Sequence, residues 1–238
     1  MAHILLVLSA SDHWTLDDGD RHPTGYWAEE FIVPHRSFHD RGVQVTIATP
    51  GGGRPSVDEA SLSADMNGGD EDKVAQMRRY IESVQDELAA PASLEDAAGR
   101  VGDFDAVYIP GGHGPMEDLA DCAPLGRILS ELHGAGKIVA AMCHGPAGLL
   151  PARRPDGGWL FEGRRVTGFS DDEERQVGLA DKARWLLEDR LRREGGRYEA
   201  GPAWESFVVT DGNLITGQNP ASSQAATDRT LEALGVPA

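Results

Sequence analysis

The chain has 238 residues and carries 39 acidic against 22 basic side chains, which gives a formal net charge of −17 at pH 7. This charge excludes a chain built to bind nucleic acid, because a phosphate backbone requires a basic surface. The length predicts one large domain, and we expect residues 1–238 to form it with an insertion at about residues 50–100.

The cysteines and the N-terminus indicate where the protein resides. Cys122 and Cys143 lie far apart and lack a CxxC spacing, which favours a reducing compartment over a disulfide scaffold. Residues 3–8 form an apolar run without the positive flank of a signal peptide, and no apolar stretch reaches transmembrane length. We therefore expect a cytoplasmic protein without a membrane partner.

The first half of the chain alternates apolar strands with helical patterns. A strand, a helix and a second strand form a βαβ unit, which implies parallel pairing by a right-handed crossover. Residues 9–24 are polar and predict a long loop, and Pro34 suggests a kink or a break in the helix that follows. The predicted strands cover residues 3–8, 43–48 and 104–109, and the predicted helices cover residues 25–41, 70–88 and 125–134.

The second half continues this alternation. Its pattern predicts a strand that ends at Cys143, a hairpin over residues 157–167 with a Glu-Gly turn, and a second hairpin over residues 207–217. Helices are expected over residues 179–193 and 222–234. Strands that alternate with helices predict a doubly wound, mostly parallel α/β sheet of the flavodoxin-like kind, with helices on both faces.

Cys143 follows an apolar run that predicts a buried parallel strand, and Gly145-Pro146 open a short apolar helix directly after it. A nucleophile on such a strand-to-helix turn has the elbow geometry of hydrolytic and acyl-transfer α/β enzymes. The helix N-terminus behind the sulfur would stabilise a thiolate. The alternative is that Cys143 is one more small buried residue at a strand end.

The loop over residues 110–115 is expected beside Cys143, because sites in open α/β sheets lie beyond the carboxyl ends of the strands. There, the N–H of Gly112 and that of His144 would form a two-donor oxyanion hole. The alternative is a tight turn without chemistry.

The histidines discriminate between enzyme classes, because all eight lie at or before position 144. A papain-like enzyme or a glutamine amidotransferase needs its base well downstream of the nucleophile, and is therefore excluded. A Cys-His pair must use His144 itself or an upstream histidine, with a carboxylate to orient the imidazole. The four acids at residues 171–174 are candidates, although such charges also serve a helix N-terminus in solvent.

Four short motifs occur in order along the chain. They are residues 110–114 (PGGHG), 141–146 (AMCHGP), 166–170 (VTGFS) and 219–222 (NPAS). Together with residues 25–30 (GYWAEE) and 211–217 (DGNLITG), they resemble the class I glutamine-amidotransferase-like (PfpI protease) superfamily. Their order and spacing are similar to those of its heat-shock-chaperone-like branch, the glutathione-independent glyoxalases, also called D-lactate dehydratases.

The resemblance implies that Cys143 is the nucleophile and His144 its adjacent base. It also implies that Glu30 contacts the cysteine sulfur and that Glu174 completes the triad, although a neighbouring acid could take that place. It implies a cofactor-free reaction that converts a 2-oxoaldehyde such as methylglyoxal to a 2-hydroxy acid, and we assign no metal ligands. Relatives are commonly dimers, so a homodimer is expected.

Members of this superfamily divide among several functions, and three alternatives are therefore open. They are a cysteine peptidase or amidase of the PfpI type, a non-catalytic stress holdase, and a redox-sensing protein. His35 and His39 have the i, i+4 spacing of a metal pair, but no Cys or HExxH context supports a metal there.

Overall fold

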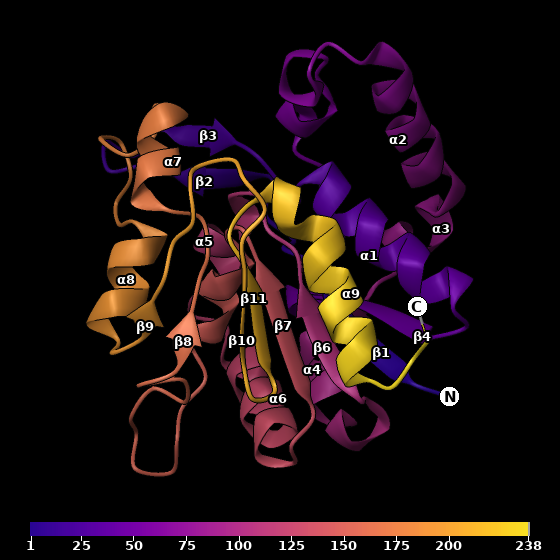
Figure 1. Ribbon diagram of the computed structural model, residues 1–238, viewed down its shortest axis with the longest axis vertical. Coiled ribbons are helices and arrows are strands. Elements are labelled where there is room, and N and C mark those ends of the chain that lie inside the picture. The colour runs from indigo at the N-terminus through magenta and orange to yellow at the C-terminus, as the bar shows by residue number, and fades with distance from the viewer. Residues whose placement is uncertain (238) are drawn as a thin grey trace.

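The computed structural model describes residues 1–237, which build a central seven-stranded sheet flanked by helices (Figure 1). The strand order is β10-β11-β7-β6-β1-β4-β5, and every pair is parallel except β10 with β11. The strands are β1 (His3–Val7), β4 (Gln44–Thr49), β5 (Ala92–Ser93), β6 (Ala106–Ile109), β7 (Ile138–Met142), β10 (Val208–Asp211) and β11 (Leu214–Gly217). This topology confirms the predicted doubly wound α/β fold.

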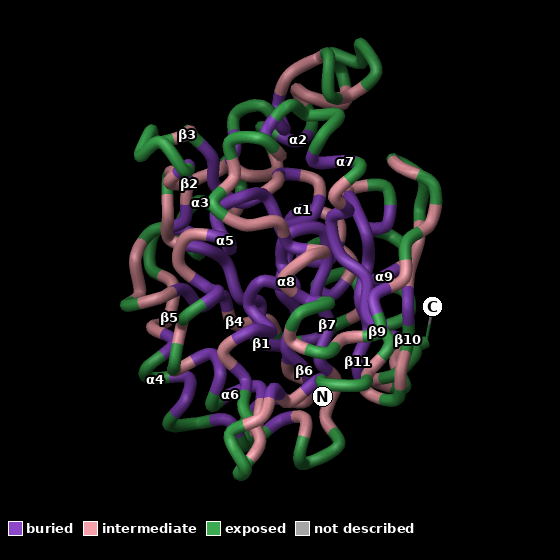
Figure 2. Tube along the Cα trace, turned by 90° about the vertical axis from the view of Figure 1, so that its left-hand side faces the viewer, coloured by how far each residue is buried: buried purple, intermediate pink, exposed green. Residues whose placement is uncertain are grey.

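Helices cover both faces of the sheet because its strands are apolar on both sides. Along β1, Leu5 and Val7 join one buried cluster, with side chains from α4 and α6, and Ile4 and Leu6 join the other, with side chains from α1 and α9. Figure 2 shows the strands as the buried centre of the molecule. The flanking helices are α1 (Ala28–Asp40), α4 (Leu94–Ala98), α6 (Ala123–Gly134) and α9 (Ser223–Ala233).

Residues 50–100 form mainly short helices, of which those over residues 59–89 lie on the side of α1 (Figure 1). The predicted helix over residues 70–88 is two helices, α2 (Glu71–Ser83) and α3 (Gln85–Ala89), because Val84 has non-helical backbone angles. Met77 and Leu88 pack onto the same cluster as α1. Strand β5, from the end of this stretch, pairs with β4 at the edge of the sheet.

Two predictions for the N-terminal segment are wrong. The expected loop over residues 9–24 contains an antiparallel hairpin of β2 (His13–Thr15) and β3 (Arg21–Pro23). The break suggested at Pro34 does not occur, because α1 runs continuously from Ala28 to Asp40, and a kink there stays a prediction. The proline ring is buried in the helix, so packing outweighs the hydrogen bond that its missing N–H removes.

The prediction of a hairpin over residues 157–167 is also wrong. Its second half, β8 (Arg165–Val166), pairs in parallel with the distant strand β9 (Arg197–Tyr198). An ion pair and a backbone bond from Arg164 and Arg165 to Asp211 hold this segment against the β10–β11 turn. The second predicted hairpin, β10 with β11, is confirmed.

The helix predicted over residues 179–193 begins only at Leu187, as α8 (Leu187–Arg193). Gly178 has a left-handed φ of 77° and ends the preceding helix, α7 (Asp171–Gln176). The carbonyl of Lys182 accepts a hydrogen bond from Asp17 N at 2.9 Å, so this carbonyl bonds to a distant segment and not within a helix. None of the described helices is long and apolar enough to cross a membrane.

Candidate active site

Cys143 follows the last residue of β7 and has a left-handed φ of 55°. For a side chain other than glycine this conformation costs about 1–2 kcal/mol, and such strain persists only where neighbours over-determine it. Here the N–H of Cys143 donates to Gly217 O at 2.9 Å, and its carbonyl accepts from Phe169 N at 2.8 Å. The predicted elbow therefore exists, with the side chain only 3% exposed.

The short apolar helix expected after Cys143 is present. It is a 3₁₀ helix over Gly145–Leu149 that packs tightly on the loop after β6. A Cβ on Gly145 would lie 2.1 Å from Ile109 O, so this approach requires glycine.

His144 connects the sulfur to a carboxylate. Its Nδ1 lies 3.5 Å from Cys143 Sγ, and its Nε2 lies 2.7 Å from Glu174 Oε2. A carboxylate only accepts, so this network assigns the proton of a neutral ring to Nε2 and leaves the lone pair of Nδ1 facing the sulfur. This arrangement suits a base that takes a proton from the thiol.

The four consecutive acids at the start of α7 have different surroundings. Ser170 and Glu173 form a capping box, and Glu173 also accepts from Asn219 Nδ2 at 2.8 Å. Glu173 is therefore occupied in holding the helix end, and Asp172 is exposed. Glu174 is the member of the run that faces His144.

The sequence analysis did not identify His113, which contacts the second oxygen of the Glu174 carboxylate. Its Nε2 lies 2.9 Å from Glu174 Oε1, and its ring centroid lies 4.0 Å from that of His144. Trp14 stacks on its other side at 5.0 Å and 15°. The sequence could have indicated His113, because the loops after the neighbouring strands β6 and β7 meet at one edge of the sheet. A histidine upstream of Cys143 was also one of the candidates for the base.

Glu30 approaches the sulfur from the first turn of α1 and is fully buried. Its Oε2 accepts from Gly111 N at 2.7 Å. The carboxyl lies beside the Cys143 thiol, and Glu30 Oε1 has no hydrogen-bond partner within residues 1–237. Glu30 is therefore a buried acid beside the sulfur and not a charge on the surface of α1.

The two buried carboxyl groups have opposite charge states at neutral pH. Burial raises the pKa of Glu30 to about 8, against the opposing effects of the Cys143 and Gly111 contacts. Burial acts in the same direction on Glu174, but the charges and hydrogen bonds of His144 and His113 outweigh it and hold the pKa of Glu174 well below its usual range. Glu30 is therefore protonated where Glu174 is a carboxylate.

The thiol and the imidazole are both neutral in the resting site. Burial lowers the pKa of His144 to about 4, assisted by the charge of His113. Burial raises the pKa of Cys143 well above its usual value, the neighbouring Glu30 carboxyl acts in the same direction, and the hydrogen bond from the Gly112 N–H acts against them. The expected helix-stabilised thiolate is thus wrong for the resting state: the sulfur carries its proton beside a neutral base.

Of the two expected oxyanion donors, the Gly112 N–H contacts the Cys143 sulfur, and His144 directly follows Cys143 in the chain. Gly112 has a φ of 86°, and a Cβ there would lie 2.2 Å from Gly25 O, so only glycine fits. Within the described chain, the N–H groups of Gly112 and His144 donate to no protein oxygen. Both are therefore available to an oxygen bound at the sulfur.

Two clusters have donor sets that could hold a metal ion. The ligand atoms of His113, His144 and Glu174 lie within 4.8 Å of one another, and so do those of His35, His39 and Glu87. In the first cluster the atoms are already hydrogen-bonded as described above. In the second, His35 lies 2.8 Å from the Tyr80 hydroxyl and 3.3 Å from Glu87 Oε2, so both of its nitrogens have partners in the fold.

Known proteins with similar sequences and folds cover almost the whole chain. The glutathione-independent glyoxalase HSP31 of Saccharomyces cerevisiae is 32% identical over 97% of this chain and 97% of its own. The crystal structure of glyoxalase III from Candida albicans matches with a TM-score of 0.81 at 25% identity over 98% of this chain and 97% of that one. The Rapid Encystment Protein of Francisella tularensis matches with a TM-score of 0.87 at 27% identity, over 98% and 99%.

The family model described as DJ-1/PfpI family matches residues 24–233, a range that contains Glu30, His113, Cys143, His144 and Glu174. The chain therefore belongs to the DJ-1/PfpI family.

Proposed function

We propose that this chain is a cofactor-free, cysteine-dependent glyoxalase that converts a 2-oxoaldehyde such as methylglyoxal to a 2-hydroxy acid. The observation that carries the proposal is the hydrogen-bonded line from Cys143 through His144 to Glu174, with protonated Glu30 on the other side of the sulfur. The names of the full-length relatives, glutathione-independent glyoxalase and glyoxalase 3, support the choice of substrate.

The first step is attack of the sulfur on the aldehyde carbon. His144 Nδ1 takes the thiol proton as the C–S bond forms, and the Glu174 carboxylate stabilises the resulting imidazolium. The aldehyde oxygen becomes an oxyanion, which accepts from the N–H groups of Gly112 and His144. Return of a proton to this oxygen gives a hemithioacetal on Cys143.

The second step moves hydrogen from the aldehyde carbon to the neighbouring keto group. His144 accepts the proton from the carbon, and Glu30, protonated at neutral pH, donates to the keto oxygen to give an enediol. His144 then returns its proton to the former keto carbon, while the hydroxyl on the sulfur-bearing carbon loses its proton to the Glu30 carboxylate, which gives the thioester of the 2-hydroxy acid. Water hydrolyses the thioester and restores the thiol, so the net reaction adds one water and needs no oxidant or reductant.

The burial of the site favours a small substrate over a peptide. Cys143 is 3% exposed, His144 1% and Glu30 0%. A peptidase would use the same residues, but it must admit an extended chain to the nucleophile. A three-carbon aldehyde needs only a narrow opening.

The test follows methylglyoxal loss and lactate formation without glutathione for the wild type, Cys143→Ala and Cys122→Ala. The matched control is Cys122, the other free cysteine, which lies in a different loop. We expect Cys143→Ala to abolish turnover and Cys122→Ala to retain it. Equal rates for the wild type and Cys143→Ala would overturn the proposal, and peptide cleavage or ammonia release without aldehyde turnover would assign the site to a hydrolase.

We also propose that the protein acts in the cytoplasm as a homodimer. The cysteine usage supports the compartment, and the resemblance described above supports the dimer. Light scattering coupled to size-exclusion chromatography tests the assembly, and a monomer mass at micromolar concentration would contradict it.

A further inference from the structure

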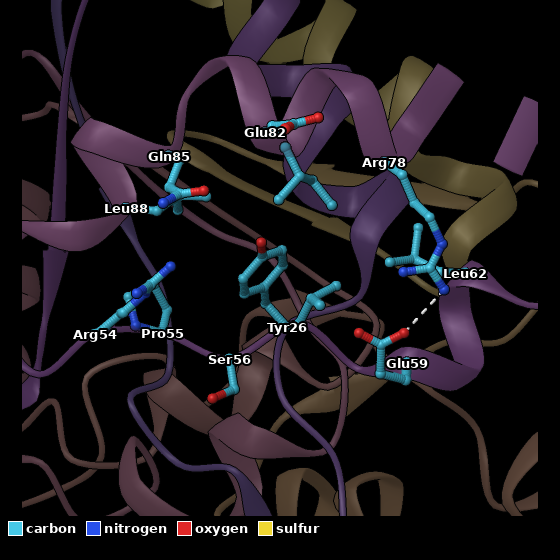
Figure 3. Close-up of a pocket in the computed structure, with 12 residues that line it drawn as sticks. Tyr26, Arg54, Pro55, Ser56, Glu59, Leu62, Arg78, Glu82, Gln85 and Leu88 are labelled. Atoms are coloured by element: carbon cyan, nitrogen blue, oxygen red, sulfur yellow. Dashed lines mark hydrogen bonds and ion pairs between the residues drawn. The ribbon is translucent and has the colours of Figure 1, made fainter. Parts of the chain in front are cut away.

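A cavity lies between helices α2 and α3 and the segment that follows β4 (Figure 3). Its volume is about 510 Å³, within the range of roughly 300–1,000 Å³ typical of small-molecule sites. None of Cys143, His144, Glu30 and Glu174 lines it. The cavity is therefore separate from the thiol site.

Tyr26 supplies a buried polar group on the floor of this cavity. The residue as a whole is 2% exposed, and its hydroxyl, which lines the cavity, makes no hydrogen bond within residues 1–237. Figure 3 shows the hydroxyl pointing into the cavity. The backbone cannot easily swing it away, because Tyr26 N donates to Ser56 O at 2.8 Å and Tyr26 O accepts from Asp58 N at 2.9 Å.

The Tyr26 hydroxyl is a donor at neutral pH, because burial raises the pKa of the phenol well above its usual value. The charge of Arg54 lies close enough to act in the opposite direction on that pKa. A ligand oxygen above Tyr26 would therefore meet a phenol donor and a guanidinium together.

Arg54 is the unpaired cation of the cavity. Its guanidinium makes no ion pair with any described residue, whereas Arg78 pairs with Glu59 at 2.9 Å. Figure 3 shows Arg54 and Arg78 on opposite sides of Tyr26. A free guanidinium offers two parallel N–H donors, the geometry that matches a carboxylate.

The remaining lining selects the rest of the ligand. Val57, Leu62, Ile81 and Leu88 give the cavity an apolar wall, which suits a hydrocarbon body. Glu59 and Glu82 also border it, and the chain carries a net charge of −17. With a single unpaired cation, this field disfavours a dianion such as phosphate and tolerates one negative charge.

We infer that this cavity is a binding site for a small organic monocarboxylate with an apolar body, held by Arg54 and Tyr26. The carboxylate accepts from the guanidinium and from the phenol hydroxyl. The hydrocarbon lies against the side chains of α2 and α3. The inference does not depend on the reaction at Cys143.

Ligand-observed NMR and calorimetry with octanoate as the probe test the site on the full chain. We expect octanoate to bind the wild type, and Arg54→Gln to weaken it by about 10-fold or more through loss of a charge-assisted hydrogen bond. Tyr26→Phe, which keeps the ring and removes only the hydroxyl, weakens it less. Arg79→Gln is the matched control, because Arg79 is an exposed arginine of α2 that does not line the cavity.

Comparison probes locate the binding and define its chemistry. Octan-1-ol, with the same body and no charge, binds more weakly than octanoate, and inorganic phosphate does not displace octanoate. Cys143→Ala retains octanoate binding, which keeps this site distinct from the thiol. Absence of octanoate binding, equal binding by the wild type and Arg54→Gln, displacement by phosphate, or loss of binding in Cys143→Ala would each overturn the inference.

Discussion

Replacing His113 by leucine tests whether the second imidazole on Glu174 contributes to the reaction. The change removes the donor that lies 2.9 Å from Glu174 Oε1 and leaves that buried oxygen without a partner. A hydrogen bond to a charged group contributes about 1.5–3 kcal/mol, and about 1.4 kcal/mol corresponds to a tenfold change in rate. If this energy serves to hold Glu174 against His144, kcat/KM for methylglyoxal falls by roughly 10- to 100-fold.

The pH profile of kcat/KM separates this positioning function from a purely structural one. After burial, the charge of His113 is the next cause of the lowered pKa of His144, which is about 4. Its removal raises that pKa, so the acidic limb of the profile moves to higher pH. His113→Gln retains a donor for Glu174 and restores most of the rate. Full activity of His113→Leu, or an acidic limb that does not move, would refute the reasoning.

Three further substitutions probe the surroundings of the thiol. Glu30→Gln raises the melting temperature at pH 7 but not at pH 4. The reason is that the pKa of Glu30 rises from 4.5 to about 8 on folding, so the stability of the wild type falls as pH rises between those values. Equal shifts of the melting temperature at both pH values would contradict this. Gly112→Ala loses both stability and turnover, since its Cβ would lie 2.2 Å from Gly25 O, whereas Gly19→Ala, with a φ of 88° and open space, keeps full turnover. Ser170→Ala removes the N-cap of α7 and lowers the free energy of unfolding by about 1 kcal/mol in urea titrations; an unchanged midpoint would speak against the cap.

The sheet was predictable where the pattern of a strand is local. Buried parallel strands are short apolar runs, so residues 3–8 and 43–48 were recognisable as β1 and β4 within a residue or two. Strand β8 was not, because its partner β9 lies on the far side of α7 and α8 in the chain. The prediction for the early residues of the expected helix at 179–193 was also wrong because of a contact distant in the chain: the Lys182 carbonyl accepts a hydrogen bond from Asp17 N.

The site was predictable to different depths for different residues. Cys143 and His144 are adjacent in the chain and follow a recognisable strand, so the residues themselves indicated them. Glu30 and Glu174 required the family resemblance, because a helix surface charge and an N-terminal helix charge look the same in sequence. His113 was missed because only the folded position of Glu174 connects it to His144.

The opposite charge states of Glu30 and Glu174 follow from what each carboxyl group contacts. Both are buried, but Glu174 faces two imidazoles, whereas one oxygen of Glu30 accepts from the Gly111 N–H and the other has no hydrogen-bond partner in the described chain. Two carboxyl groups pushed apart in pKa by their environments can supply an acid and a negative charge at the same pH. In this site Glu30 lies beside the sulfur and Glu174 contacts its base. A hydrogen transfer between neighbouring carbons needs a base that can be stabilised when protonated and an acid near the keto oxygen, and this pairing provides both without a cofactor.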